Sequence, residues 1–223
     1  MIDPLQQFSW PDLHAKYDGL CKRFNPLVPY LDCSYPRPTS DRFLYYALRQ
    51  RFALELNSPD GIGLQTFQAM LYWKLYSQPA AVSSTCKRLI EDGDLRRQAS
   101  KGLRAASAAL RNAPAAGLNI ISETRKLGSH AIWGMKTSTS LPVRTTFLHF
   151  IHPETIPIFD KQVLLAVGVT EKGANQKMQF LETYIAHATT LARTHSVHFS
   201  SFYNETPIRL VDMALWVVRG GCN

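Results

Sequence analysis

The sequence is poor in cysteine and contains no cysteine cluster. Its four cysteines, Cys21, Cys33, Cys86 and Cys222, are widely scattered, and no C-x-x-C spacing occurs. Cysteine-ligated zinc sites and iron–sulfur clusters use closely spaced thiols, so the scattered cysteines argue against both. We interpret the four residues as reduced structural or surface thiols.

The histidines show no metal-binding pattern either. Seven are present, but none forms an H-x-x-x-H or H-E-x-x-H motif. His149 and His152 are three residues apart and would share a helix face, but a single pair is a weak metal signal. We therefore expect neither a metal ion nor another cofactor.

Long apolar runs are also absent. No stretch approaches the about 20 apolar residues that a membrane-spanning helix needs. The N-terminal residues MIDPLQQFSW lack the charged-then-apolar order of a signal peptide. We expect a cytoplasmic protein with no membrane partner, and the hydrophobic fraction of 45% supplies a core.

Period-two alternation is scarce, whereas helix signals are frequent. Ser9 with Pro11 predicts a helix that starts there and runs to about residue 24, and Asp41 predicts a helix over 41–57. Thr206-Pro207 predicts the start of the last helix, which glycines end. A proline-rich connector over 26–38 separates the first two helices.

These signals predict an all-α fold of about ten helices. The chain is long enough for one compact domain over 1–223. An alternative is two closely packed lobes, the first formed by 1–40 with 160–223 and the second by 41–159.

The charge is concentrated in one region. The net charge is +8, and residues 85–126 hold nine basic against four acidic residues, which is five of the eight excess charges. Four of the basic residues fall on one helix face: Arg97, Lys101, Arg104 and Arg111. This face is either a solvated surface or a stripe that contacts phosphates.

Asp160 ends a mostly apolar stretch, LPVRTTFLHFIHPETIPIFDKQV, over 141–163. Pro142 suits the first turn of a short helix and Ser140 is a candidate cap for it. Asp160 precedes the apolar run VLLAVG, where an acid caps a helix and matches its dipole. A helix cap is thus one role for Asp160, and a functional carboxylate is the other.

The stretch resembles the helix-hairpin-helix (HhH-GPD) superfamily of DNA glycosylases. Leu141-Pro142-Val143-Arg144-Thr145-Thr146 resembles the family's hairpin and following helix, and Ile158-Phe159-Asp160-Lys161-Gln162-Val163 resembles the segment that carries its catalytic aspartate. The resemblance covers about 30 residues. It implies an enzyme that binds double-stranded DNA as a monomer and flips a base into a pocket.

Two departures from the family pattern refine this expectation. Residues 140–143 contain no glycine, although the family hairpin is usually glycine-rich. Arg144 stands where bifunctional members carry a lysine nucleophile, and arginine cannot form a Schiff base. The resemblance therefore implies a monofunctional glycosylase without lyase activity. Its substrate would be a damaged or modified base, either in housekeeping repair or in antiviral defence against foreign DNA such as phage genomes. The divergent hairpin favours the second role.

The resemblance and the charge pattern give a set of candidate site residues. Asp160 is the catalytic candidate. The candidates for DNA contacts are Arg144, Thr145, Lys136, Lys161, Gln162, Arg97, Lys101, Arg104 and Arg111. The candidates for the base pocket are Trp133, His149, Tyr45, Tyr46 and Trp73, with a core role as the alternative.

Two further hypotheses come from other functional classes. The first alternative to a glycosylase is a non-catalytic helical nucleic-acid-binding protein, which the missing hairpin glycines favour. The second alternative is a protein-interaction module. A second glycine-containing segment, Asp60-Gly61-Ile62-Gly63, is predicted to be a turn between two core helices rather than a DNA-binding hairpin.

Overall fold

A computed structural model of the chain describes residues 1–21, 41–75, 78–112, 117–129, 141–201 and 205–219. Over these ranges the chain is all-helical and has no strand, so the predicted all-α fold is confirmed. It forms η1 (Leu5–Gln7), α1 (Trp10–Cys21), α2 (Asp41–Asn57), α3 (Leu64–Leu75), α4 (Pro79–Glu91), α5 (Gly93–Asn112), α6 (Gly117–Ser129), α7 (Leu141–Ile151), α8 (Lys161–Ala166), η2 (Ala174–Gln176), α9 (Met178–Thr194), η3 (Ser196–Ser201) and α10 (Pro207–Val218).

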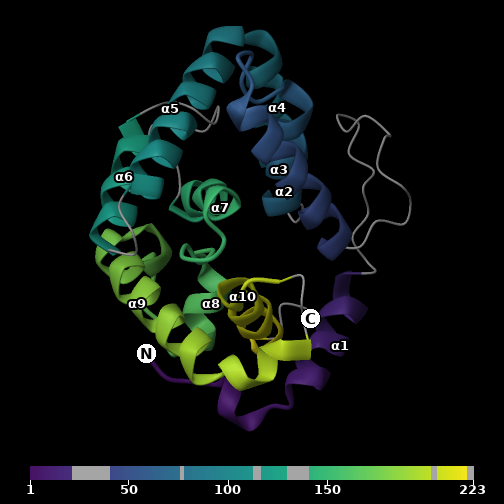
Figure 1. Cartoon of the computed structure of the whole chain (residues 1–223), viewed down its shortest axis with the longest axis vertical. Coiled ribbons are helices and arrows are strands. Elements are labelled where there is room, and N and C mark those ends of the chain that lie inside the picture. Colours follow the sequence, from purple (N-terminus) through teal and green to yellow (C-terminus); the bar gives the residue numbers. More distant parts are fainter. Residues whose placement is uncertain (22–40, 76–77, 113–116, 130–140, 202–204, 220–223) are drawn as a thin grey trace.

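The helices form two groups (Figure 1). The first contains α2 to α7, which pack mainly on one another, and the second contains α1, α8, α9 and α10. Contacts between α6 and α9 and between α1 and α2 join the groups. The segment that joins α7 to α8 therefore runs from one group into the other.

α7 is the central helix of the first group (Figure 1). Nine of its eleven residues are buried, including Val143 and Phe147. A helix that is apolar on all sides belongs in a core, and α2, α3, α5 and α6 cover it. Of the residues expected to form the hairpin, Ser140 lies outside the described residues, and 141–143 form the first turn of α7 instead.

The second group is centred on α10, which packs on α1, α8 and α9. Thr206 caps α10, because its Oγ1 accepts a hydrogen bond from the backbone N–H of Arg209 at 3.3 Å. The predicted start of this helix is thereby confirmed. The N-terminal segment is attached just after α8, where Ile2 N donates to Val167 O at 3.0 Å.

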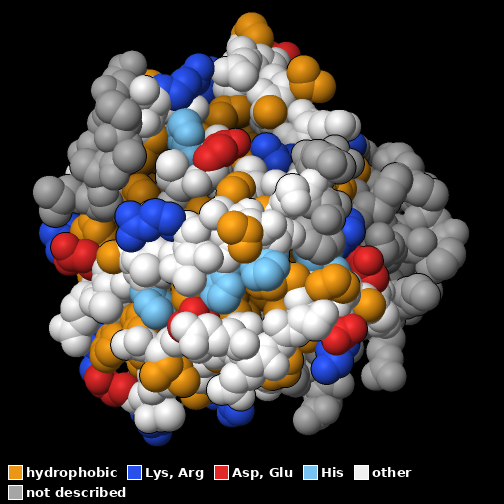
Figure 2. All heavy atoms as spheres, turned by 60° about the horizontal axis from the view of Figure 1, so that its bottom comes forward, with side chains coloured by type: hydrophobic (Ala, Val, Ile, Leu, Met, Phe, Trp, Pro, Cys, Tyr) orange, Lys and Arg blue, Asp and Glu red, His pale blue; other side chains and the backbone are white. Residues whose placement is uncertain are grey.

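The lower face of the molecule is formed by this second group (Figure 2). Histidine, hydrophobic and neutral side chains mix there, and the drawn Lys and Arg side chains are scattered rather than clustered (Figure 2). Among the described helices, none is long and apolar enough to cross a membrane.

Candidate active site

Asp160 is the N-cap of α8, as its sequence position predicts. Its backbone is extended, with φ −143° and ψ 178°. The carboxylate Oδ1 accepts hydrogen bonds from the backbone N–H groups of Gln162 at 2.8 Å and Val163 at 3.1 Å. These bonds satisfy two amides of the first turn and fix the direction of the carboxylate.

Lys74, near the C-terminal end of α3, binds the second oxygen of the same carboxylate. Its Nζ lies 3.2 Å from Oδ2 of Asp160, and the side chains of Lys74 and Asp160 are 10% and 24% exposed. Asp160 is therefore held by three donors and still reaches solvent. Sequence reasoning missed Lys74, because it lies 86 residues before Asp160 and no local pattern links the two.

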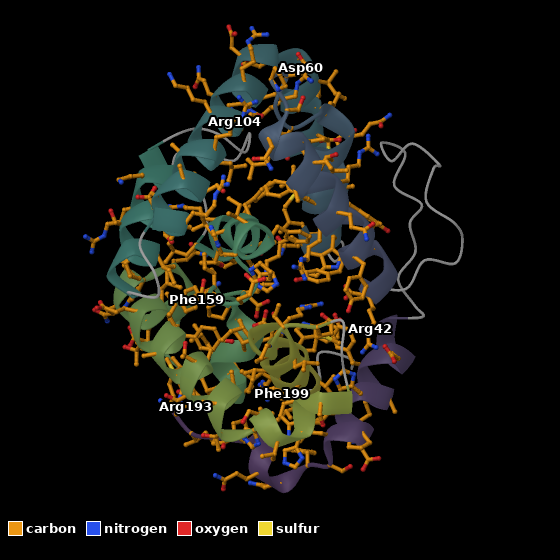
Figure 3. All side chains as sticks on the ribbon, in the orientation of Figure 1. Arg42, Asp60, Arg104, Phe159, Arg193 and Phe199 are labelled. Carbon is orange, nitrogen blue, oxygen red and sulfur yellow. The ribbon has the colours of Figure 1, made fainter. Side chains whose placement is uncertain are left out.

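The backbone before Asp160 is held by α7 and by α10. Phe159 N donates to Oγ1 of Thr145 at 3.1 Å, and Ile158 N donates to Oδ2 of Asp212 at 3.1 Å. Phe159 lies at the boundary between the two helix groups (Figure 3). The segment that presents Asp160 is thus anchored in both groups.

Thr145 requires a correction. The sequence predicts that it contacts DNA, but its side chain is fully buried. Its hydroxyl donates within α7 to Leu141 O at 3.0 Å and accepts from Phe159 N. Its hydroxyl therefore positions the backbone next to Asp160 and does not reach a DNA surface.

Asp212, on α10, is a second and buried carboxyl group next to the segment that leads to Asp160. It accepts hydrogen bonds from Ile158 N and from the hydroxyl of Tyr184, the latter at 3.3 Å. Burial raises the pKa of Asp212 to about 7, opposed by the charge of Arg209 and reinforced by the negative charge of Asp160. Asp212 on α10 therefore holds the backbone two residues before Asp160, and the two carboxyl groups have different environments.

Arg209 is the buried cation of the site and joins α10 to the first group. Its Nη2 donates to the hydroxyl of Tyr17 at 2.7 Å and lies 3.2 Å from Oδ2 of Asp41. Its guanidinium lies 4.5 Å from the ring centroid of Tyr45 and 5.3 Å from that of Trp73. The cation–π contacts and the ion pair offset the cost of burying this charge.

Two predicted base-pocket residues, Tyr45 and His149, also need correction, because both are fully buried. Nδ1 of His149 lies 2.6 Å from Ile156 O and must donate to it, so Nε2 accepts from the Tyr45 hydroxyl at 2.7 Å. Burial lowers the pKa of His149 to about 3. In this conformation the two rings form a closed, neutral part of the core rather than a pocket wall.

The other pocket candidates have different positions. Trp73 is buried at 7% exposure beside Arg209. Tyr46 is half-buried and lines a hollow of about 630 Å³ between α2 and the end of α7, together with Arg49, Phe150 and Glu154. Trp133 lies outside the described residues.

The DNA-contact candidates near Asp160 are only partly available. Lys161 is exposed and Gln162 is half-buried at the start of α8. Arg144 is half-buried and its Nη1 donates to Thr124 O at 3.1 Å, which joins α7 to α6. Burial lowers the pKa of Arg144. Lys136 lies outside the described residues.

The four stripe residues all lie on α5, as predicted. Arg97 pairs with Asp94, and Arg111 donates to Oγ of Ser107 at 3.2 Å. Arg104 donates instead to backbone carbonyls of the turn after α2. Lys101 is exposed. Part of the stripe therefore has a structural role.

The polar groups at the start of α8 hold a fixed carboxylate beside an ammonium group. Within the described ranges, no three His, Cys, Asp or Glu side chains gather closely enough to hold a metal ion. Comparison with protein-family models, curated proteins and solved structures finds no match.

Proposed function

We propose that the chain is a monofunctional DNA glycosylase in which Asp160 is the catalytic carboxylate. The observation that carries the proposal is the fixed, partly exposed carboxylate of Asp160 at the junction of the two helix groups. The resemblance of 141–163 to the HhH-GPD superfamily gives this carboxylate its role. Duplex DNA is the proposed partner.

The carboxylate of Asp160 would stabilise the transition state electrostatically. Breaking an N-glycosidic bond builds positive charge on the deoxyribose. A carboxylate already fixed by backbone amides needs no reorganisation when that charge appears, and low solvent exposure strengthens the interaction. Asp160 would also orient the attacking water, because a carboxylate oxygen accepts its proton as a general base.

Lys74 acts as a positioning residue in this proposal. Its ammonium group holds Oδ2 of Asp160 at 3.2 Å, while the start of α8 holds Oδ1. Both oxygens therefore keep their place before the substrate arrives. Small displacements of a catalytic group are costly to rate, so removal of Lys74 should slow base release without removing the carboxylate.

DNA would approach along the exposed start of α8. Lys161 follows Asp160 directly and is exposed, so it is placed to contact a phosphate next to the reacting nucleotide. The lower face has scattered rather than clustered cations, which argues against DNA binding there (Figure 2). The excised base is proposed to be a modified one, and bases of foreign DNA are the first group to test.

Base release distinguishes this proposal from others. The purified chain is incubated with duplexes that each contain one modified base, and the products are treated with alkali. A glycosylase leaves alkali-labile abasic sites, whereas intact strands from every duplex would contradict the proposal. A pure binder retards DNA without producing such sites, and a protein-interaction module does neither.

A non-catalytic nucleic-acid-binding protein is the second candidate. One observation favours it: both oxygens of Asp160 already have partners, as a purely structural helix cap would. On this alternative, Asp160→Asn leaves DNA binding unchanged and there is no excision to lose.

A further inference from the structure

A concave, positively charged site lies at the end of the first group, on the turn between α2 and α3. A hollow of about 550 Å³ forms where this turn packs against the first half of α5. It is lined by Pro59, Asp60, Ile62, Gly93, Arg96, Arg97, Ser100, Lys101 and Arg104. Asp60 and Arg104 lie together at the upper end of the molecule, well away from Phe159 (Figure 3).

Specific contacts fix the wall of the hollow. Gly61 has φ +75°, and a Cβ at this position would lie 2.7 Å from Cβ of Ser100. Ile62 N donates to Oγ of Ser100 at 3.0 Å, and Arg104 donates to the carbonyls of Ser58 and Pro59. The predicted turn between core helices is confirmed, and its close approach to α5 gives the hollow a defined shape.

The charge of the hollow is unbalanced. Four cationic side chains and one carboxylate, that of Asp60, line it. A concave site with this excess of positive charge favours a ligand that brings anionic oxygens.

Side chains, rather than the glycine turn itself, would bind such a ligand. The amides of Ile62 and Gly63 already donate to Ser100 and Glu55. Arg97 pairs with Asp94 and Arg104 holds the turn, so Arg96 and Lys101 remain for a ligand. The planar guanidinium group of Arg96 matches the oxygens of a phosphate. The volume lies within the range of pockets that hold a nucleotide-sized group.

We propose that this hollow binds a backbone phosphate of DNA, at a distance from the nucleotide that reacts at Asp160. The proposal rests on the proposed function for the identity of the ligand. It makes the first half of α5 a second point of DNA contact, which fixes the direction of the duplex across the molecule. Lys101, exposed on the same helix, extends the positive surface away from the hollow.

The salt dependence of DNA binding tests this site. The variant Arg96→Gln/Lys101→Gln removes two charges and spares Arg104, which holds the turn. The matched control Lys172→Gln/Arg193→Gln removes two exposed charges from the second group. Affinity for a duplex is measured by fluorescence anisotropy over a range of salt concentrations, on proteins shown by circular dichroism to be folded.

We expect the slope of log affinity against log salt concentration to be shallower by about two units in Arg96→Gln/Lys101→Gln than in the wild type. The slope of the control should be nearly that of the wild type. Equal changes in the two variants would reduce the site to a general charge effect and overturn it. Melting temperatures with inorganic phosphate and with a mononucleotide test the source of the phosphate. One outcome is that phosphate or the mononucleotide raises the melting temperature of the wild type but not of Arg96→Gln/Lys101→Gln, while both proteins show the same salt dependence of DNA binding. This outcome would assign the hollow to a free phosphate compound and overturn the DNA assignment.

Failure of this site and failure of the glycosylase are distinguishable. Base excision with no difference in slope between the variants overturns the phosphate site alone. A slope difference without base excision supports the site and overturns the glycosylase. A wild-type protein that does not bind DNA overturns both.

Discussion

Replacing Asp160 separates its structural role from its chemical one. Asp160→Asn keeps an oxygen that accepts from Gln162 N and Val163 N, because asparagine is also a good helix cap. It loses the charge that pairs with Lys74 at 3.2 Å. A partly exposed ion pair contributes up to about 1 kcal/mol, which corresponds to about 2–4 °C in melting temperature for a chain of this size.

The effect on base release should be far larger than the effect on stability. Loss of a preorganised electrostatic group slows a reaction by about 10²-fold or more, which is about 2.7 kcal/mol of transition-state stabilisation. Asp160→Ala loses the cap as well, so its melting temperature should fall by a further 2–4 °C or about 1 kcal/mol. Its rate should be as low as that of Asp160→Asn.

Single-turnover excision on the best modified duplex, together with thermal melting and DNA affinity, provides the measurement. The expected pattern is a large loss of rate in both variants, a graded loss of stability and unchanged DNA affinity. Full activity in Asp160→Asn would refute the catalytic role and leave Asp160 as a helix cap only.

Four other predictions concern the Asp160 site and the buried groups around it. Borohydride should trap no covalent adduct between the wild-type protein and DNA. The variant Lys74→Met should slow base excision about tenfold. An adduct that forms with the wild type and disappears in Lys74→Met would make Lys74 a nucleophile and overturn the monofunctional assignment. The pKa of Asp212 is raised from 3.8 to about 7, so the folded state binds a proton at this carboxyl group more tightly than the unfolded state does. The stabilisation that this proton gives the folded state is complete below about pH 4 and is lost as the pH rises from about 4 to 7. Thermal melts should show the wild type losing stability relative to Asp212→Asn over that range, and a constant difference would contradict the shift. Tyr45→Phe leaves the buried Nε2 of His149 without its donor and should cost about 1–3 kcal/mol in denaturant unfolding, whereas an unchanged midpoint would contradict the hydrogen bond.

The helices and their caps are readable from the sequence because their signals are local. Asp160 and Thr206 occupy the cap positions that their neighbours predict, and both side chains accept from backbone amides of the first turn. Gly61 adopts the positive φ that a glycine turn requires. Each of these signals spans only a few residues, so one sequence suffices to find it.

The partners of the candidate site are not readable in the same way. Lys74 meets Asp160 across 86 residues, and Arg209 meets Asp41 across 168. No periodicity or spacing encodes such pairs, since the packing of the two helix groups creates them. The same packing buries Thr145, Tyr45 and His149, and no local pattern distinguishes a buried polar side chain from one that faces a ligand.

Alkali-labile abasic sites in DNA treated with the wild-type protein test the central claim most directly. End-labelled duplexes, each carrying one alkylated, oxidised, deaminated or hydroxymethylated base, are incubated with the protein, and half of each sample is heated with alkali before denaturing electrophoresis. We expect a strand break at a modified position that requires alkali and is absent with Asp160→Asn. Intact strands in all duplexes that the protein binds, with and without alkali, would contradict it.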